Sequence, residues 1–504
     1  MTYTEYMSLS FFQRFWYKFS QFIKAIPSGI GKFFCAIGRG IKNAVIGFFK
    51  GCADFILGFI KGDIITKISY VIMGFGNVCR GQIVKGLAFF MIECLYILFM
   101  VFFGGTYISL FFSLTAVKET VTSEFMGMTM TQNLVKHYSV QILLYGILVI
   151  MATIAVLAIY IASTKSARKV EAIVKSGQRP PTFRQEAKDL MDAKFHTTML
   201  SLPVILICVF VLLPLIFMIM MAFTNYSEFN YDSFNWVGVD NFKEIFSTSA
   251  NGPSMGLTFA KITGWTIIWA IFATFSNYIL GMVVALMINK KGIKLKKLWR
   301  TMFVMTIAVP QFVTLLVMAQ MLGSAGNSPL NQIISMFTGE PSAVNVLSPA
   351  NNAILARVTV ILVNVWVGIP YTILMTSGIL MNIPEDLYES ARIDGAGPVK
   401  SFTKITLPYM LFVTTPYLIT TFIGNINNFN VIYLLTQGGP NVSDYAYSAG
   451  KTDLLITLLF KLSVNRNLYG LGAAIGILVF IVCATISLVT FNMTKSAKNE
   501  EEFS

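Results

Sequence analysis

The chain has 504 residues, of which 55% are hydrophobic and only 12% are charged. Soluble globular proteins carry about twice that share of charged residues, so this composition excludes an ordinary soluble protein and indicates an integral membrane protein. The formal net charge of +14 lies mainly between the apolar stretches. That distribution favours basic cytoplasmic loops over a nucleic-acid-binding face, and we expect no nucleic acid among the partners.

The cysteines and histidines indicate no metal or haem site. The six cysteines form no CxxC pair, and most lie in apolar segments, where a thiol packs as a small hydrophobic group. His137 and His196 lie at segment edges. We therefore expect no cofactor on this chain.

Residues 1–84 are predicted to form an amino-terminal region on the cytoplasmic surface. Within it, residues 8–62 alternate lysines with aromatic and aliphatic runs, and GFFKG at 47–51 recurs as GFIKG at 58–62. An eleven-residue step is close to three helical turns, so the repeated lysines fall on one face. This pattern favours a basic amphipathic helix on the inner leaflet. A loosely ordered extension with no role in transport is an equal alternative. The region lacks the compact apolar core of a cleavable signal peptide.

Eight later stretches are long and apolar enough to cross a bilayer as helices, which needs about 20 residues each. They cover residues 87–114, 139–163, 198–223, 258–289, 301–323, 353–380, 409–436 and 468–493. Runs of this length exclude barrel strands, so we predict an all-α membrane protein with eight transmembrane helices. We divide it into two spans with a basic loop at 85–197, a six-span core at 198–494 and a tail at 495–504.

The orientation follows from the distribution of lysine and arginine. The segment 164–197 holds eight of them, and 290–300 holds six with no acidic residue. Both segments are predicted to be cytoplasmic, whereas 324–352 contains neither lysine nor arginine and is predicted to be external. Eight spans then place both termini in the cytoplasm. We expect a multi-pass protein of a bacterial cytoplasmic membrane.

The loop at 382–408 carries local signals for two short helices joined by a sharp turn. Pro384 suits a first helical position, and Glu385 and Asp386 favour the positive end of a helix. Gly395 permits an ending with positive φ, and Pro398 opens the second helix. Small residues nearby leave a surface with little bulk, which suits docking in a cleft of another protein.

This loop resembles the EAA loop of permeases from binding-protein-dependent ABC importers. The resemblance rests on Glu389, Ser390 and Ala391, then Asp394, Gly395 and Ala396, then Ile405, Leu407 and Pro408. Ser390 is the one departure, because the family has a second alanine there. In that family the loop couples the permease to the ATP-binding subunit, so the resemblance implies that these nine residues do the same here.

Residues 198–494 are similar to the larger permease subunit of maltose and maltodextrin importers, the MalF type. The similarity is carried by VNVWVGIPY at 363–371, INNFNVIYLLTQGGP at 426–440 and AGKTDLL at 449–455. NWVGVDNFKEIF at 235–246 is a more general feature of sugar permeases. Enteric relatives carry a large insertion after the third span, whereas only 34 residues, 224–257, stand here. A binding-protein contact through that insertion is therefore not expected to carry over.

Polar residues inside two of the spans suggest a substrate site. Asn364, Gly368 and Tyr371 share one helical face through offsets of four and seven, and Thr421, Asn425 and Asn428 repeat those offsets. Amides both donate and accept hydrogen bonds to sugar hydroxyls, and an aromatic ring covers the apolar face of a pyranose. The alternative is that these asparagines join helices, at about 0.6 kcal/mol each.

The MalF-type resemblance implies a sugar site at these positions. Asn364, Gly368, Tyr371, Asn425 and Asn428 match residues that line the maltose site in that family, while Thr421 and Gly424 stand where it has serine and phenylalanine. The two replaced residues leave the exact sugar open.

These observations predict a permease subunit of an ATP-driven sugar importer, with maltose, maltodextrins or related oligosaccharides as substrate. The chain contains no GxxxxGK[ST] loop, so ATP and Mg²⁺ are expected on separate subunits and this chain is expected to be no enzyme. The expected partners are a second permease, two ATP-binding subunits, an extracytoplasmic sugar-binding protein and membrane lipids. The alternatives are a permease for another sugar class and an ion-coupled secondary transporter, for which Glu93 is the notable acidic candidate. The lack of histidine ligands and clustered carboxylates disfavours a membrane enzyme.

Overall fold

The structure is a computed structural model that describes residues 35, 38–40, 42–125, 128–248, 253–290, 292–323, 328–342, 344–348 and 352–493. The chain divides into two compact units. The first unit consists of Ala36–Asn241 with Leu468–Ala474, and the second contains Phe242–Asn467 with Ile475–Ser504. Each unit is described by itself.

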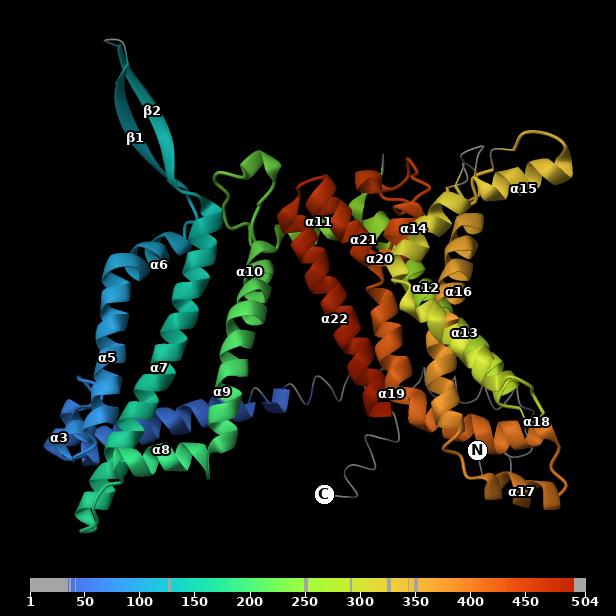
Figure 1. Cartoon of the computed structure of the whole chain (residues 1–504). Helices are drawn as coiled ribbons and strands as arrows, with labels where there is room; N and C mark the ends of the chain where they lie inside the picture. The colour runs from blue at the N-terminus through green and yellow to red at the C-terminus, as the bar shows by residue number, and fades with distance from the viewer. Residues whose placement is uncertain are drawn as a thin grey trace. The chain divides into compact units, whose positions relative to one another are not determined.

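The first unit contains four long helical segments, Gly38–Lys61, Ile83–Phe111, Ser139–Lys175 and Phe195–Met221, in the described part of the chain. Figure 1 shows how they are arranged in this unit. After a helix at Gly38–Lys61, its elements are α3 (Ile64–Ile68), α4 (Phe75–Cys79), α5 (Ile83–Phe99), a π-helical turn (Met100–Gly104), α6 (Gly105–Phe111), α7 (Ser139–Lys175), α8 (Phe183–Met191), α9 (Phe195–Ile207), a second π-helical turn (Cys208–Leu212), α10 (Leu213–Met221) and a 3-10 turn (Glu228–Asn230). The short helix α11 (Asp240–Ile245) crosses the boundary between the units. The buried core of the first unit includes Tyr107, Phe111, Leu143 and Phe234.

A β-hairpin projects from the end of this unit where α6 and α7 meet (Figure 1). Strand β1 (Val117–Phe125) pairs antiparallel with β2 (Met128–His137). At its base, the buried Ser139 hydroxyl donates to the carbonyl oxygen of Leu114 and accepts from the amide of Phe234 at 3.1 Å. The predicted all-α fold had no strands here, because this polar, threonine-rich connection lacks the apolar alternation of a half-buried sheet.

The helix Gly38–Lys61 runs across the lower ends of α5 and α7 instead of alongside them (Figure 1). It is tied to the unit by Arg168, which donates to the carbonyl of Asp54 at 2.8 Å, and by Tyr70, which donates to that of Phe55 at 3.1 Å. This helix is also long and apolar enough to span a membrane, so the interfacial placement of residues 8–62 stays a prediction. Residues 8–34 of that prediction lie outside the described residues.

A small polar cluster fixes the chain just after this helix. Arg80 pairs with Asp63 at 2.6 Å and also donates to Thr66 at 2.7 Å, while Thr66 donates to Glu171 of α7 at 2.7 Å. Burial alone raises the pKa of the Asp63 carboxyl, but hydrogen bonds from Arg80 and Thr66 outweigh it and lower the pKa to about 2. The cluster therefore holds residues 63–80 against α7, with Asp63 in its charged form.

The second unit packs its helices around α12. Its elements are α12 (Met255–Asn289), α13 (Lys296–Ala308), α14 (Gln311–Met321), α15 (Pro329–Thr338), α16 (Ala353–Leu380), α17 (Glu385–Ile393), α18 (Pro398–Ser401), a π-helical turn (Phe402–Thr406), α19 (Leu407–Ile426), α20 (Phe429–Thr436), a 3-10 turn (Ala446–Ser448), α21 (Leu455–Phe460), a further π-helical turn (Lys461–Asn465) and most of α22 (Tyr469–Met493). Trp265 and Trp269 of α12 pack in one buried cluster with Leu315, Val360 and Val431.

Eight helices in the described part of the chain are long and apolar enough to span a membrane, and seven of them coincide with predicted spans. This confirms a multi-span helical membrane protein. The eighth is Gly38–Lys61, whereas the predicted span 301–323 consists of α13 and α14, bent by 87°. Pro310 explains this break. It cannot donate the helical hydrogen bond, and it keeps the preceding residue Val309 in an extended conformation.

Candidate functional site

The predicted coupling loop folds as two helices with a tight turn, at the end of the second unit opposite to α15 (Figure 1). Pro384 is the residue before α17 instead of its first residue, and Pro398 opens α18 as predicted. Gly395 has φ +75°, and the amide of Ala396 donates to the carbonyl of Ala391 at 2.8 Å. A glycine is needed at this turn because other residues strain at positive φ.

The coupling loop exposes apolar as well as acidic side chains. Ile393 is 87% exposed and Val399 is 76% exposed, and Glu389 lies open beside them in sequence. At the base of the loop Ile383 is buried, and the Tyr388 hydroxyl hydrogen-bonds that of Thr406 at 2.8 Å. The loop is thus anchored at its base and presents an apolar tip. Ser390, Asp394 and Pro408 are exposed, whereas Ile405 and Leu407 are partly buried.

The predicted sugar face of α16 lies partly against α12. Asn364 is 5% exposed, and its Nδ2 has no hydrogen-bond partner among the described residues. One turn on, Gly368 faces Asn277 of α12 so closely that a Cβ on Gly368 would lie 2.7 Å from the Asn277 Oδ1 atom. That oxygen is also buried without a described partner. An unpaired donor and an unpaired acceptor therefore occur on facing helices, at Asn364 and Asn277.

The predicted residues of the seventh span are more strongly tied into the fold. Asn425 donates to Thr274 of α12 at 2.9 Å, and its Oδ1 accepts from Asn428 at 3.3 Å. Asn428 in turn caps α20 by accepting from the amide of Val431 at 3.3 Å. Asn425 thus joins α19 to α12, which is the alternative left open by the sequence, and Asn428 also caps α20.

Helix α12 was predicted as the span 258–289, but its residues Asn277 and Thr274 were not predicted to lie at the site. No hydrogen bond joins the predicted residues of α16 to those of α19 and α20 within the described part of the chain; both sets contact α12 through Asn277 and Thr274 instead. These two residues are three apart and share a helical face, which is the signal that could have identified them. Gly424 borders open space, and Thr421 and Tyr371 are at least partly exposed.

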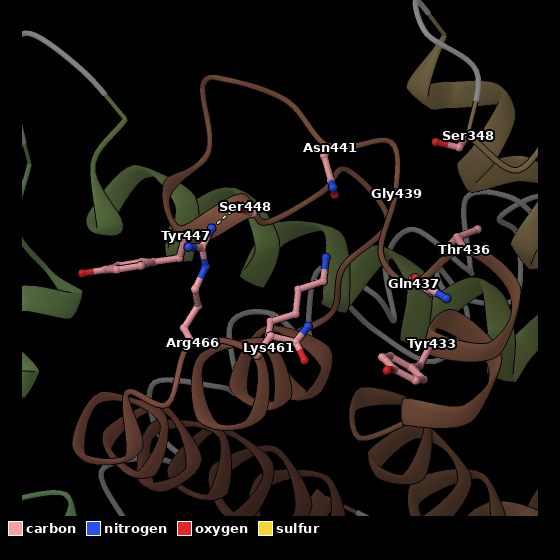
Figure 2. Close-up of a pocket in the computed structure, with 11 residues that line it drawn as sticks. Ser348, Tyr433, Thr436, Gln437, Gly439, Asn441, Tyr447, Ser448, Lys461 and Arg466 are labelled. Atoms are coloured by element: carbon pink, nitrogen blue, oxygen red, sulfur yellow. Dashed lines mark hydrogen bonds between the residues drawn. The ribbon is translucent and has the colours of Figure 1, made fainter. Parts of the chain in front are cut away.

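A separate pocket of about 450 Å³ lies beyond α20 in the second unit (Figure 2). Its lining consists of Ser348, Tyr433, Thr436, Gln437, Gly439, Asn441, Tyr447, Ser448, Lys461, Asn465 and Arg466. None of these residues was predicted as a site residue. They come from Ser348 and from the ranges 433–441, 447–448 and 461–466. Four of them lie in the stretch 426–440 that carries the MalF-type resemblance, but that resemblance gave them no site role.

A buried ion pair supports the floor of this pocket. Lys461 binds Asp453 at 2.6 Å, and both side chains are almost fully buried. Asp453 also accepts from the amide of Gly450 at 2.6 Å and from the Thr457 hydroxyl at 2.9 Å. A buried charge pair is stable only with such additional donors, and here they fix the loop that ends at Asp453. Figure 2 shows Lys461 reaching into the pocket.

Comparisons with known proteins agree with this architecture. Residues 277–494 match the family described as binding-protein-dependent transport system inner membrane component. The chain is 32% identical over 437 residues to the maltodextrin transport system permease protein MdxF of Bacillus subtilis (strain 168), covering 86% of this chain and 95% of that protein. It is 31% identical over 435 residues to the galactooligosaccharides transport system permease protein GanP of the same organism, covering 85% and 97%.

The similarity to the maltose/maltodextrin transport system permease protein MalF of Vibrio vulnificus (strain YJ016) is 32% identity over 268 residues, or 52% of this chain and 49% of that protein. Identity above 30% across nearly the whole length of a relative exceeds what a shared helical composition produces. The chain therefore belongs to the family of binding-protein-dependent transport system inner membrane components, as a permease of the MalF type.

Proposed function

We propose that this chain is the permease subunit of an ATP-driven importer of oligosaccharides, of the maltodextrin or galactooligosaccharide class. The names of its relatives support that substrate class. The observation that carries the proposal is the unpaired donor on Asn364 and the unpaired acceptor on Asn277, buried on facing helices. A sugar hydroxyl both donates and accepts, so hydroxyls suit such a pair.

The sugar would be bound by Asn364, Gly368 and Tyr371 from α16, together with residues of α19 and α20. The second set is Thr421, Gly424, Asn425 and Asn428. Asn277 and Thr274 of α12 support both sets. Open space at Gly424 leaves room for a sugar ring where a bulkier residue would narrow it. Gly368 serves close packing against Asn277, which orients that amide.

Coupling to ATP hydrolysis would run through the loop at 382–408. Two ATP-binding subunits would hold ATP and Mg²⁺, and each would present a cleft to a coupling loop. Glu389 and the exposed tip of Ile393 and Val399 supply a charged and an apolar contact for such a cleft. An external sugar-binding protein would deliver the substrate. A second, different permease would complete the path.

The proposal also includes an orientation in the membrane and a role for each part of the chain. The basic segments 164–197 and 290–300 would be cytoplasmic together with both termini, and 324–352 would be external. Residues 1–84 would lie at the inner surface, 85–197 would add two spans and the basic loop, 198–494 would form the transport core and 495–504 the tail.

Glu93 gives little support to an ion-coupled transporter. Its Oε2 atom accepts a hydrogen bond from the amide of Met73 at 2.8 Å, which ties the middle of α5 to the turn before α4. A carboxylate that satisfies a backbone amide has a structural role that needs no ion pathway.

The test is to purify the complex and reconstitute it in proteoliposomes with its sugar-binding protein. We expect an ATPase to co-purify, and maltodextrins or galactooligosaccharides to stimulate ATP hydrolysis and enter the vesicles. Asn364→Ala should reduce uptake while leaving the ATPase bound. Sugar uptake that persists without any ATPase subunit, or stimulation by no saccharide, would overturn the proposal.

A further inference from the structure

We propose that the pocket beyond α20 is a second saccharide subsite, which holds the outer rings of an oligosaccharide whose inner end occupies the site at Asn364 and Asn425. This inference rests on the proposed function and names a further element of it. The volume of about 450 Å³ falls within the range of small-ligand pockets, roughly 300–1,000 Å³. Nothing in the sequence motifs assigns this pocket a role.

The lining offers polar groups that the fold itself does not use. In the described part of the chain, the side chains of Tyr433, Gln437, Asn441 and Asn465 form no hydrogen bond. Three of these four are amides, each with two donors and a carbonyl acceptor, and the fourth is a phenol. Such a set complements a ligand that carries many hydroxyl groups.

The charge of the lining is compatible with a neutral ligand. Lys461 is neutralised by Asp453 at 2.6 Å, and Arg466 donates to the hydroxyl of Ser448 near the surface. An anion would be satisfied by donors alone, and the amide carbonyls of the lining would face it unpaired. The mixture of donors and acceptors therefore favours a polyhydroxylated compound over a carboxylate or phosphate.

An aromatic ring lies at one wall and is held in place. Tyr433 stacks on Phe429 at 4.7 Å between ring centroids and meets Phe460 edge-on at 4.9 Å. Figure 2 shows Tyr433 with Gln437 on the same side of the pocket. A fixed ring with an apolar face and a polar tip suits a pyranose, which also has both.

The position of the pocket matches an extended chain of sugar rings. Asn428, a predicted sugar residue, is the residue before α20, and Tyr433 follows five residues later on that helix. Five residues of helix rise about 7.5 Å. The pocket thus begins near the proposed membrane site and continues away from it, at the end of the unit opposite to the coupling loop (Figure 1).

The loop that closes the pocket is rigid enough to form a site. Gly438 has φ +83°, and a Cβ there would collide with the Asp453 carboxylate, so the backbone lies directly on the buried ion pair. The Thr452 hydroxyl donates to the carbonyl of Gly439 at 2.6 Å. Preorganised groups of this kind lose little freedom when a ligand binds.

The test compares saccharides of different length in the reconstituted complex with saturating, sugar-loaded binding protein. Uptake of maltose and of maltotetraose is measured for the wild type and for the double variant Asn441→Ala with Asn465→Ala. Removal of two hydrogen-bonding groups should lower maltotetraose uptake about tenfold and leave maltose uptake within twofold. Tyr433→Phe should shift the ratio in the same direction. Ser443→Ala, on the same exposed loop but outside the lining, is the matched control and should leave the ratio unchanged.

Three other outcomes would contradict the proposed second subsite. Equal loss for both sugars indicates a structural role for the pocket, and no loss for either indicates no role; both overturn the subsite. Lost stimulation of ATPase by the binding protein with an unchanged length ratio would make the pocket a protein contact and would also overturn it.

Failure of the proposed function has a different signature. If Asn364→Ala leaves both sugars unaffected, the membrane site is wrong while the length ratio of the pocket variant still decides the subsite. If the wild type imports neither sugar, saturation-transfer NMR of the purified complex with maltotetraose is the readout. Binding that is lost in the double variant then supports the subsite, and its absence in the wild type overturns both.

Discussion

Asn277 of α12 lies directly against Gly368 of α16, where a Cβ would come within 2.7 Å of its amide oxygen. This contact aligns the two helices that carry the unpaired acceptor of Asn277 and the unpaired donor of Asn364. The width of the proposed sugar site at this level thus depends on the absence of a side chain at one position.

Gly368→Ala should therefore impair transport, although alanine in place of glycine normally stabilises a helix. The added methyl group has to displace Asn277, so we expect uptake to fall about tenfold or more while the complex still assembles. Radiolabelled sugar uptake at matched expression measures this. Gly378→Ala, on the same helix with open space around it, is the matched control and should transport normally. Equal behaviour of the two variants would contradict the close contact.

Replacement of Asn364 and of Asn425 should have different effects on the stability of the protein. Asn364→Ala removes a buried donor without a partner, so unfolding temperature should stay the same or rise while sugar uptake falls about tenfold. Asn425→Ala breaks hydrogen bonds with Thr274 and Asn428 and should lower stability by about 1–3 kcal/mol as well as uptake. Thermal unfolding in detergent and uptake assays distinguish them. Normal uptake by both variants would place the sugar path elsewhere.

Gly395→Pro should uncouple the permease from its ATPase. Proline fixes φ near −65°, whereas this turn has φ +75°. We expect the ATP-binding subunits to wash off during purification, or uptake to fail, with the permease still in the membrane. Gly397→Pro is the control, because Gly397 has φ −71° and precedes α18. Normal uptake by a well-expressed Gly395→Pro variant would refute the coupling role.

Asp63→Asn should weaken the cluster that holds residues 63–80 on α7. A fall in pKa from 3.8 to about 2 corresponds to roughly 2.5 kcal/mol, which partial exposure of Asp63 reduces to about 1–2 kcal/mol. Because the folded pKa is depressed, this stabilisation is present above about pH 4 and is lost as pH falls towards 2. Unfolding temperature of wild type and variant should differ at pH 7 and converge below pH 3. Asp54→Asn, an exposed carboxylate on the preceding helix, should show no such convergence.

A chain that starts near residue 63 should still insert and support at least partial transport. The contacts of Thr66 and Arg80 with α7 remain in this truncated protein. Membrane fractionation and uptake assays test it. Complete loss of transport at normal levels and with normal partner binding would show that the preceding region is required.

Much of the fold follows from the sequence because a bilayer imposes length and apolarity on each span. Seven predicted spans coincide with long helices, and the turn at Gly395 has the backbone that glycine implies. The break at Pro310 was missed because the apolar run continues across it. Periodicity identifies a face of one helix but not the helix that it meets, so the role of Asn277 was not predicted. The pocket was missed for a stronger reason, since its lining joins Ser348 to residues that follow it 85 to 118 positions later in the sequence.

The hairpin at 117–137 has a consequence for any protein that approaches the membrane surface on that side. Strands of nine and ten residues reach about 30 Å from their base, at roughly 3.3 Å per residue. An isolated two-stranded ribbon has little stability of its own, so its direction depends on the anchor at Ser139 and Phe234. Those two residues therefore determine the direction of the hairpin. The hairpin in turn limits how closely a large soluble protein can approach this part of the membrane.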